Sequence, residues 1–484
     1  MSLPTDAIGQ YPAQTVKNIG VGDVFDFFAL LGACLLLAWE TWDLAAERPE
    51  MESVAILLGL NGAAAIAGLW VSLRRRFPTL LASFYFSYIF FSIAPLQQIR
   101  VKFDPIFNND SVLFATVFLC LMLTAIALGA LYFRARPASA ISGPRGFFSR
   151  SSYDCDFHPL SLFIAVAVVS CALLALYGSS LLISRETSSA AIADQFDRIG
   201  FVFVSACLNA FVFIGAVIGV LAAKFNNNRP WLLAFLLLLA IAELISNPIA
   251  TARFRASELI VFALLAFFGW NNARLLLAFL LTGVAVSPIF NMFRTAIWGE
   301  VDRRSFDTFF AHIDFDAFAM TSYAIHHVGQ AAYGYGSNLL ATLLFFVPRA
   351  IWTDKGLPVG ILVFPQVRYY RAVGTDVLAS PPIAEGFYDY GYIGAFLLTA
   401  ALFVAFVFLE RRAQAAEPSS PLRLMACLLP MLAILALRGT LTVAYSEFWG
   451  NFVALTIAVA LARLKIRVGP PLVTLQRARA DAEK

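Results

Sequence analysis

The sequence contains few charged residues. Asp, Glu, Lys and Arg make up 14% of its 484 residues, whereas 60% of the residues are hydrophobic. A soluble domain carries about 25% charged residues. The composition therefore excludes a soluble globular protein and predicts an integral membrane protein. The net charge is only +4, so the placement of the basic residues along the chain is more informative than their total.

The usual signatures of metal, nucleotide and disulfide chemistry are also absent from the sequence. The six cysteines mostly lie in apolar runs without a C-x-x-C pair, and we interpret them as small hydrophobic residues. There is no P-loop, EF-hand, H-E-x-x-H or G-x-G-x-x-G pattern, so nothing demands a metal ion, a cofactor or a nucleic acid. Residues 1–24 are polar and lack the apolar run of a secretory signal, so we predict no cleaved leader.

Twelve apolar stretches approach the length of a transmembrane helix, which needs about 20 residues. They cover roughly residues 24–42, 53–73, 79–99, 112–133, 160–183, 200–223, 231–249, 256–270, 273–291, 391–409, 422–439 and 447–463. We therefore predict an all-α polytopic membrane protein with about twelve transmembrane helices. We see no internal repeat.

Lys and Arg in short loops predict the orientation, because cytoplasmic loops are enriched in both. If the sides alternate along the chain, the side of the N-terminus collects 20 of the 35 basic residues and the short loops of the other side collect 8. We therefore predict that both termini are cytoplasmic.

The remaining seven basic residues fall in one long segment, residues 292–390, on the external side. This segment separates a first part, residues 1–291 with nine predicted spans, from residues 391–484 with three spans and a basic tail. A long loop in a chain of tight connections is usually functional. Its cations lie on the side that basic residues usually avoid, which favours an anionic ligand as the reason for them.

The stretch "NPIATARFRASEL", residues 247–259, places two arginines at an outer connection. Arg253 and Arg255 lie beside the expected N-terminus of the eighth span, where free N–H groups attract anions. Guanidinium groups bind phosphate oxygens in a bidentate fork, so the pair is a candidate phosphate clamp. The alternative is that both side chains only reach the lipid headgroups.

Residues 305–334 are predicted to form a helix. His312, Asp316, Tyr323 and His327 recur at spacings of four, seven and four, so they would share one face. A His and an Asp one turn apart could move a proton. The alternative is a solvated polar face of a surface helix.

The apolar run "NLLATLLFF" is too short to span a bilayer. We predict a helix that lies in the interface or re-enters the membrane and that ends at Pro348. Arg349, Trp352 and Lys355 would follow at the level of the lipid headgroups.

The last polar stretch, residues 364–396, leads into the tenth span. It carries Arg368 and Arg371, then Glu385, Tyr388 and Asp389, with the two carboxylates one helical turn apart. These carboxylates are either catalytic or simply cap a helix. Arg438 lies near the outer end of the eleventh span, where a charged residue is a candidate functional residue by default.

The order of these blocks resembles the bacterial O-antigen and oligosaccharide repeat-unit polymerases, the Wzy type. That family carries a Pro-Arg/Lys-x-x-Trp-x-x-Lys block, matched here by Pro348, Arg349, Trp352 and Lys355. Its Gly-Glu-x-Tyr-x-x-x-Gly block is matched by Glu385, Tyr388 and Gly391, with Ala384 in place of the first glycine. The resemblance covers residues 247–396.

The resemblance implies a GT-C-like glycosyltransferase of the bacterial inner membrane that uses a polyisoprenoid-diphosphate-linked oligosaccharide, such as an undecaprenyl diphosphate glycan. It would polymerise repeat units for O-antigen, capsule or exopolysaccharide at the periplasmic face, without a metal, beside a flippase and a chain-length regulator. We expect Glu385 to be the base, with His327 second and Asp389 as a further catalytic candidate. The expected diphosphate and glycan ligands are Arg253, Arg255, Arg294, Arg349, Lys355, Arg368, Arg371, Tyr388, Arg438 and Trp352.

Three alternative functions remain open from the sequence. An O-antigen ligase would use the same cations to move a finished glycan to another acceptor. A lipid or solute transporter would favour internal repeats and broken helices at the middle of the membrane. A non-catalytic assembly protein would leave the external basic residues unexplained.

Overall fold

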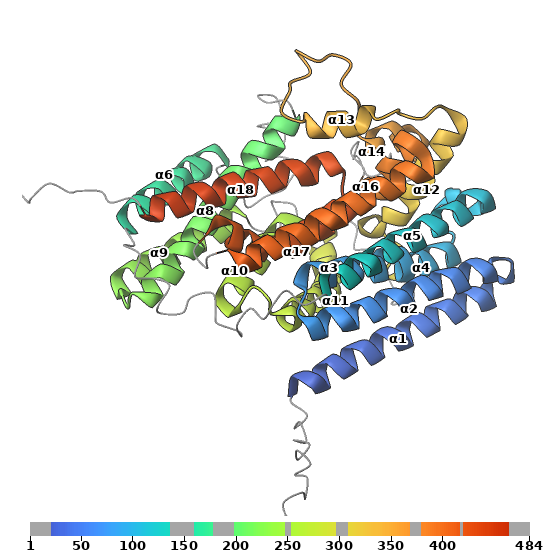
Figure 1. The fold of residues 1–484 in the computed structure, drawn as a ribbon, viewed down its shortest axis with the longest axis horizontal. Helices are drawn as coiled ribbons and strands as arrows, with labels where there is room; N and C mark the ends of the chain where they lie inside the picture. The colour runs from blue at the N-terminus through green and yellow to red at the C-terminus, as the bar shows by residue number, and fades with distance from the viewer. Residues whose placement is uncertain are drawn as a thin grey trace, which may run out of the picture.

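The computed structural model describes residues 21–135, 159–177, 198–246, 253–296, 308–367, 379–416 and 420–463. Every regular element in these ranges is a helix, and they contain no strand (Figure 1), so the all-α prediction is confirmed for them. The N-terminal helices are α1 (Val21–Glu47), η1 (Pro49–Met51), α2 (Glu52–Arg75), α3 (Pro78–Tyr88), η2 (Ile89–Ile93), α4 (Ala94–Arg100), η3 (Pro105–Asn108) and α5 (Asp110–Ala135). The central helices are α6 (Pro159–Tyr177), α8 (Arg198–Phe225), α9 (Arg229–Ile245), α10 (Arg253–Phe268), α11 (Ala273–Ala296), η7 (Ile313–Phe315) and α12 (Ala317–Gln330). The remaining helices are α13 (Ser337–Leu343), α14 (Val359–Val363), η8 (Phe364–Gln366), α16 (Pro382–Ala415), α17 (Pro421–Arg438) and α18 (Leu441–Arg463).

Nine helices in the described residues are long and apolar enough to cross a membrane. They are α1, α2 with η1, the continuous rod from α3 to α4, α5, α6, α8, α16, α17 and α18. The chain is therefore a multi-pass membrane protein by helix length and composition. The predicted count of twelve depends on three more helices that are shorter, namely α9 with 17 residues, α10 with 16, and the apolar part of α11, Ala273–Val286.

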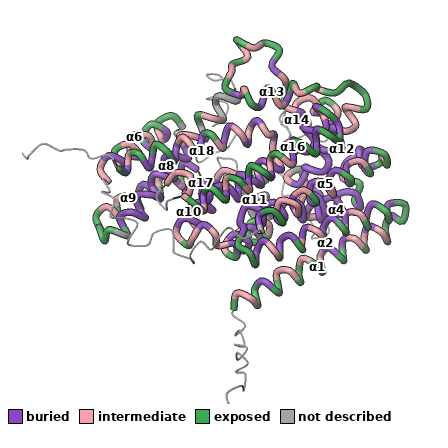
Figure 2. The backbone as a smooth tube through the Cα atoms, in the orientation of Figure 1, coloured by how far each residue is buried: buried purple, intermediate pink, exposed green. Residues whose placement is uncertain are grey.

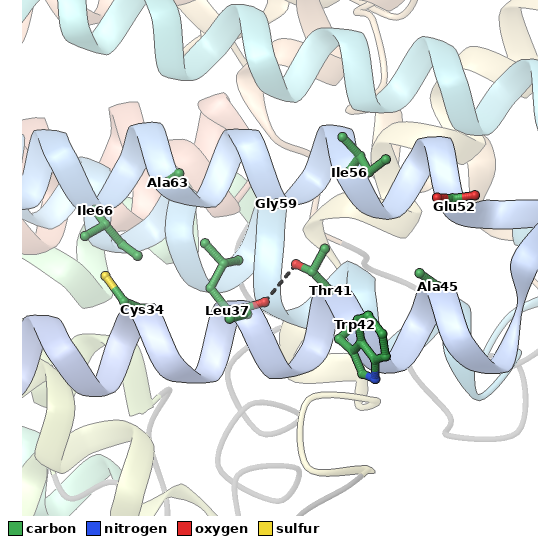
Figure 3. A pocket seen from close by; sticks show the side chains of 11 residues that line it. Cys34, Leu37, Thr41, Trp42, Ala45, Glu52, Ile56, Gly59, Ala63 and Ile66 are labelled. Carbon is green, nitrogen blue, oxygen red and sulfur yellow. Dashed lines mark hydrogen bonds between the residues drawn. The ribbon is translucent and has the colours of Figure 1, made fainter.

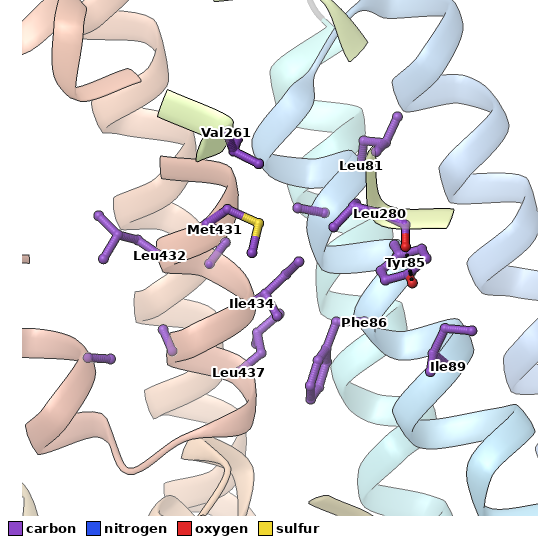
Figure 4. Close-up of a cluster of buried hydrophobic side chains, with 14 of the residues drawn as sticks. Leu81, Tyr85, Phe86, Ile89, Val261, Leu280, Met431, Leu432, Ile434 and Leu437 are labelled. Atoms are coloured by element: carbon purple, nitrogen blue, oxygen red, sulfur yellow. Dashed lines mark hydrogen bonds between the residues drawn. The ribbon is translucent and has the colours of Figure 1, made fainter. Parts of the chain in front are cut away.

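The centre of the bundle is built on α3, whose residues are all buried, and on α17, whose residues are mostly buried. Figure 4 shows how Phe86 of α3 faces Ile434 and Leu437 of α17. The Tyr85 hydroxyl donates a hydrogen bond to the carbonyl of Leu280 in α11 at 3.0 Å, so the polar group of this buried ring is satisfied.

Helix α1 lies at the edge of the bundle, and many of its residues are exposed (Figure 2). Phe28 and Leu35 are 63% and 62% exposed, which suits contact with lipid rather than with water. An open groove of about 620 Å³ runs between α1 and α2. Figure 3 shows Cys34, Leu37 and Trp42 along one wall and Ile56 and Ile66 along the other.

Residues predicted on the cytoplasmic side contact one another. Arg274, at the start of α11, pairs with Asp23 and Asp26 at the start of α1, both at 2.9 Å. Arg134 at the end of α5 pairs with Glu410 near the end of α16 at 3.1 Å. These contacts define one end of the bundle, which we call the basic end.

Residues predicted on the external side also contact one another. Gln98, at the end of α4, donates hydrogen bonds to the carbonyls of Phe310 and Phe315, both at 3.0 Å. The Tyr323 hydroxyl of α12 donates to Asp104, in the connection after α4, at 2.6 Å. We call this end, where the described part of residues 292–390 packs, the loop end. Which end faces the cytoplasm stays a prediction.

Two helix predictions within the long segment are wrong in extent. In the described residues 308–334, η7 and α12 replace the single predicted helix, because His312 has extended backbone angles and its Nδ1 accepts a hydrogen bond from the Asp314 amide at 3.1 Å. His312 therefore does not share a helix face with Tyr323 and His327. The predicted interfacial helix ends at Leu343, five residues before Pro348.

Candidate functional site

The candidate site lies at the loop end, around the turn that joins α17 to α18. Three contacts near this turn join elements that are distant in sequence. Arg438 of α17 reaches Asp316 before α12, Arg255 of α10 reaches Glu447 of α18, and Glu385 of α16 reaches the first residue of α18. Sequence spacing alone does not predict this meeting point.

The two carboxylates of α16 each hold the start of another helix. Both oxygens of Glu385 lie 3.2 Å from the amide nitrogen of Leu441, which begins α18, and the Asn338 side chain also hydrogen-bonds to this carboxylate. Asp389 accepts hydrogen bonds from the amides of Asn338 and Leu339, in the first turn of α13, at 3.4 and 3.0 Å. Glu385 is 0% and Asp389 2% exposed. A carboxylate at a helix N-terminus is favourable, so both residues have a structural role whatever else they do.

Glycines in α16 allow a kink that places its two carboxylates against the starts of α18 and α13. The helix is kinked at Tyr390 and Gly391, where Gly391 has a φ of +62°. A Cβ on Gly386 would lie 2.5 Å from the carbonyl oxygen of Gly394, so the backbones before and after the kink touch. The kink bends the first two turns of α16 away from its long transmembrane part and leaves both carboxylates on this short segment.

A buried ion pair links α10 to α18. Arg255 Nη2 lies 2.8 Å from Glu447 Oε1. Glu258, one turn along α10, is 1% exposed, bonds to Glu447 and accepts a hydrogen bond from the Asn451 amide at 2.6 Å. Arg255 is therefore engaged by a carboxylate. Arg253 begins α10, and its side chain lies outside what the structure describes.

Arg438 is held more loosely than Arg255. Its Nη2 lies 3.7 Å from Asp316 Oδ1, beyond hydrogen-bond length, and its guanidinium stands 6.0 Å from the centre of the Phe90 ring. The Arg438 side chain is 32% exposed and that of Asp316 only 4%. An anion can therefore approach Arg438 from solvent while Asp316 stays behind it.

The matched Pro-Arg-x-x-Trp-x-x-Lys block folds onto itself. Arg349 donates hydrogen bonds to the carbonyls of Lys355 and Gly356 at 2.8 and 3.1 Å. Lys355 is 3% exposed, and its ammonium donates to the carbonyls of Phe345 and Val347 at 2.8 and 2.9 Å. Both cations close a loop after α13. Trp352 lies in this loop and is half-buried.

His327 is a half-buried imidazole in the last turn of α12, at the opposite end of this helix from Asp316. Its Nδ1 is 3.0 Å from the Gln366 amide nitrogen, and its ring centre lies 6.1 Å from that of Tyr388. Burial lowers the pKa of His327, and the charge of neighbouring His326 lowers it further. At neutral pH this side chain is therefore neutral and able to accept a proton.

Three exposed tyrosines lie beside the kink and are not among the site residues predicted from the sequence. Tyr333, Tyr335 and Tyr390 are 42%, 72% and 53% exposed, and the rings of Tyr333 and Tyr335 are 6.3 Å apart. The sequence pattern that could have indicated them is the alternation of tyrosine and glycine in "YGYG" and "YDYGYIG". A Cβ on Gly334 would lie 2.3 Å from the Tyr388 ring, so these glycines allow the two segments to pack closely.

The other predicted site residues are not placed by this structure. Arg368 and Arg371 lie outside the described residues, and Arg294 is described only as part of the α11 backbone. In the described part of the chain no three His, Cys, Asp or Glu side chains are grouped as metal ligands. Two acidic residues close together in the sequence, Asp314 and Asp316, have different partners. Asp314 contacts His312 and Asp316 contacts Arg438.

Comparisons with protein-family models, with curated proteins and with solved structures found no match to this chain.

Proposed function

We propose that this chain is a glycosyltransferase that polymerises polyisoprenoid-diphosphate-linked oligosaccharide repeat units at the external face of a bacterial inner membrane. One observation carries the proposal: near the turn from α17 to α18, Arg438 pairs with Asp316, Arg255 pairs with Glu447 and Glu385 binds the Leu441 amide. A transferase of this kind needs cations and a base at the membrane surface, because the donor diphosphate lies at the headgroups and its sugar must be attacked there.

The reaction breaks one bond and forms one bond. The acceptor hydroxyl oxygen attacks the anomeric carbon of the donor sugar, and the bond from that carbon to the diphosphate oxygen breaks. The lipid diphosphate leaves with the electron pair, and the hydroxyl proton passes to a base. Fixed cations stabilise the negative charge that grows on the leaving group.

Two observations support His327 as the base in preference to Glu385. His327 is partly exposed and its pKa is lowered, so it is neutral at neutral pH. Glu385 has no exposed surface, and both of its oxygens accept from the Leu441 amide. Glu385 and Asp389 then position α18 and α13 within the site.

Arg438 is the described cation best suited to meet the diphosphate. Its pair with Asp316 is longer than a direct hydrogen bond and its side chain is one-third exposed. Arg349 and Lys355 hold backbone carbonyls and would shape the loop instead. Arg253 begins α10 at the same end of the bundle, as the pair between neighbouring Arg255 and Glu447 of α18 indicates.

The test is reconstitution of the purified protein with a defined undecaprenyl-diphosphate-linked repeat unit. A ladder of longer lipid-linked glycans, with release of undecaprenyl diphosphate, is expected. Transfer only to a lipid A-type acceptor would instead identify a ligase. Movement of intact substrate across proteoliposomes without any new glycosidic bond would identify a transporter.

A further inference from the structure

A second cavity lies at the loop end, outside the residues assigned above. It is a pocket of about 350 Å³ between the start of α5 and the last turns of α12. Pockets that hold small molecules range from about 300 to 1,000 Å³. His326 in its wall directly precedes His327, and adjacent helical residues point about 100° apart. The pocket therefore opens on a neighbouring face of α12.

The pocket wall carries hydrogen-bonding groups but no carboxylate, lysine or arginine. Its polar residues are Asn109, Ser111, His326 and Gln330. An anion such as a diphosphate finds no lysine or arginine there. Side chains with several hydrogen-bond donors and acceptors match a polyhydroxylated ligand.

These polar side chains are fixed by bonds that leave other atoms for a ligand. Asn109 Oδ1 accepts from the Ser111 hydroxyl at 2.9 Å and from the Val112 amide at 3.3 Å, so its side-chain N–H groups are not used in these bonds. A ring nitrogen of His326 lies 2.9 Å from the Gln330 amide nitrogen, which leaves the Gln330 carbonyl oxygen as an acceptor. Val112 and Ile325 add apolar surface against which the C–H face of a sugar ring can pack.

Gly329 keeps the pocket open. It lies in the last turn of α12, which ends at Gln330. A Cβ at this position would find no atom within 4 Å, so packing within the protein does not require glycine. The absent side chain instead leaves space in the pocket wall.

We propose that this pocket binds a neutral sugar residue of the glycan and holds it beside the transfer site. The proposal deepens the proposed function and depends on it for the identity of the glycan. The pocket itself is tested separately, because free sugars carry no diphosphate and cannot be transferred.

The experiment uses the full chain in lipid nanodiscs and saturation-transfer NMR. The probes are glucose, galactose, mannose, rhamnose and N-acetylglucosamine, each added alone. At least one should receive saturation from the wild-type protein. Gly329→Leu should weaken that sugar's binding by at least about tenfold, which corresponds to 1.4 kcal/mol. His326→Ala should weaken it as well, through loss of a hydrogen-bond partner.

Gly129→Leu is the matched control, because Gly129 is also helical with no atom within 4 Å of its Cβ position but lies elsewhere on α5. This variant should bind the sugar as the wild type does. Equal binding by Gly329→Leu and wild type, or no binding of any of the five sugars, would overturn the pocket assignment. Sugar binding that Gly329→Leu abolishes, in a protein that extends no lipid-linked glycan, would leave the pocket standing and remove the proposed function.

Discussion

Glu385 and Leu441 are joined at the point where α16 meets the start of α18: both carboxylate oxygens lie 3.2 Å from the Leu441 amide nitrogen. The contact bridges 56 residues of sequence. Glu385 therefore caps the N-terminus of α18. This structural role is distinct from the role of a catalytic base.

Substitutions of Glu385 should distinguish its capping role from a catalytic role. Glu385→Gln keeps an acceptor for Leu441 and should lower stability by no more than about 1 kcal/mol. Glu385→Ala leaves a buried amide unpaired and should lower stability by about 1–3 kcal/mol. Thermal unfolding in nanodiscs measures both changes in stability. If Glu385 affects activity only through stability, chain extension by Glu385→Gln should stay within about fivefold of wild type. A loss near 10³-fold in a stable Glu385→Gln protein would restore Glu385 as the base.

His327→Gln should reduce chain extension by about 10²–10⁴-fold, the usual effect of removing a general base. Glutamine can still contact Gln366, so the protein should insert and bind lipid-linked substrate normally. The measurement is single-turnover extension with bound substrate. Normal extension would exclude His327 as the base.

The lowered pKa of His327 also predicts a pH dependence of stability. The folded state binds the proton less readily than the unfolded state, whose pKa is near the ordinary value of 6.5. The stability contribution of neutral His327 is therefore complete above this value and is lost as the pH falls from 6.5 towards the lower folded pKa. Unfolding temperatures measured between pH 7.5 and 5 should fall less steeply for His327→Gln than for wild type. An identical slope would contradict the assigned direction.

Arg438→Lys should separate a forked phosphate contact from a point charge. Loss of one charge-assisted hydrogen bond costs about 1.5–3 kcal/mol, or roughly 10- to 150-fold in rate if it acts at the transition state. Arg349→Lys is the comparison, because Arg349 holds two backbone carbonyls and its loss should lower stability rather than the rate of the folded enzyme. Normal extension by Arg438→Lys would remove this residue from the diphosphate site.

The backbone at Gly391 should tolerate no side chain. With φ at +62° and ψ at −149°, alanine there should cost about 1–3 kcal/mol. Gly129→Ala, in a regular helix with open space, should be neutral or should stabilise by up to about 1 kcal/mol. Thermal unfolding of the two variants is the test. Equal stability would mean that the kink is not needed.

The predicted orientation can be tested with single cysteines in a background without the six native ones. Tyr335 is 72% exposed at the loop end, and Asn226 is exposed in the turn after α8. Tyr335→Cys should react with an impermeant maleimide in intact spheroplasts, whereas Asn226→Cys should react only after lysis. The reverse pattern would place the site in the cytoplasm and end the proposed mechanism.

Hydropathy along the chain was sufficient to predict an all-helical membrane protein, because an apolar run of transmembrane length can satisfy its backbone in lipid only as a helix. The long helices lie close to their predicted positions, since 112–133 became Asp110–Ala135 and 422–439 became Pro421–Arg438. The number of transmembrane helices was harder to predict, because α9 and α10 are slightly shorter than the thickness of a bilayer.

The roles of the charged residues were decided by the tertiary structure. The sequence identified Arg255 as a candidate by its place beside an expected helix N-terminus, and Glu385 and Lys355 by the two blocks of the family resemblance. It could not show that Glu447 neutralises Arg255, or that Lys355 closes its own loop by binding the carbonyl of Phe345. A buried charge must be paired or hydrogen-bonded, and its partner lies wherever the fold brings one within about 3 Å. That partner is ten residues away for Lys355 and 192 away for Arg255, a difference that no local pattern encodes.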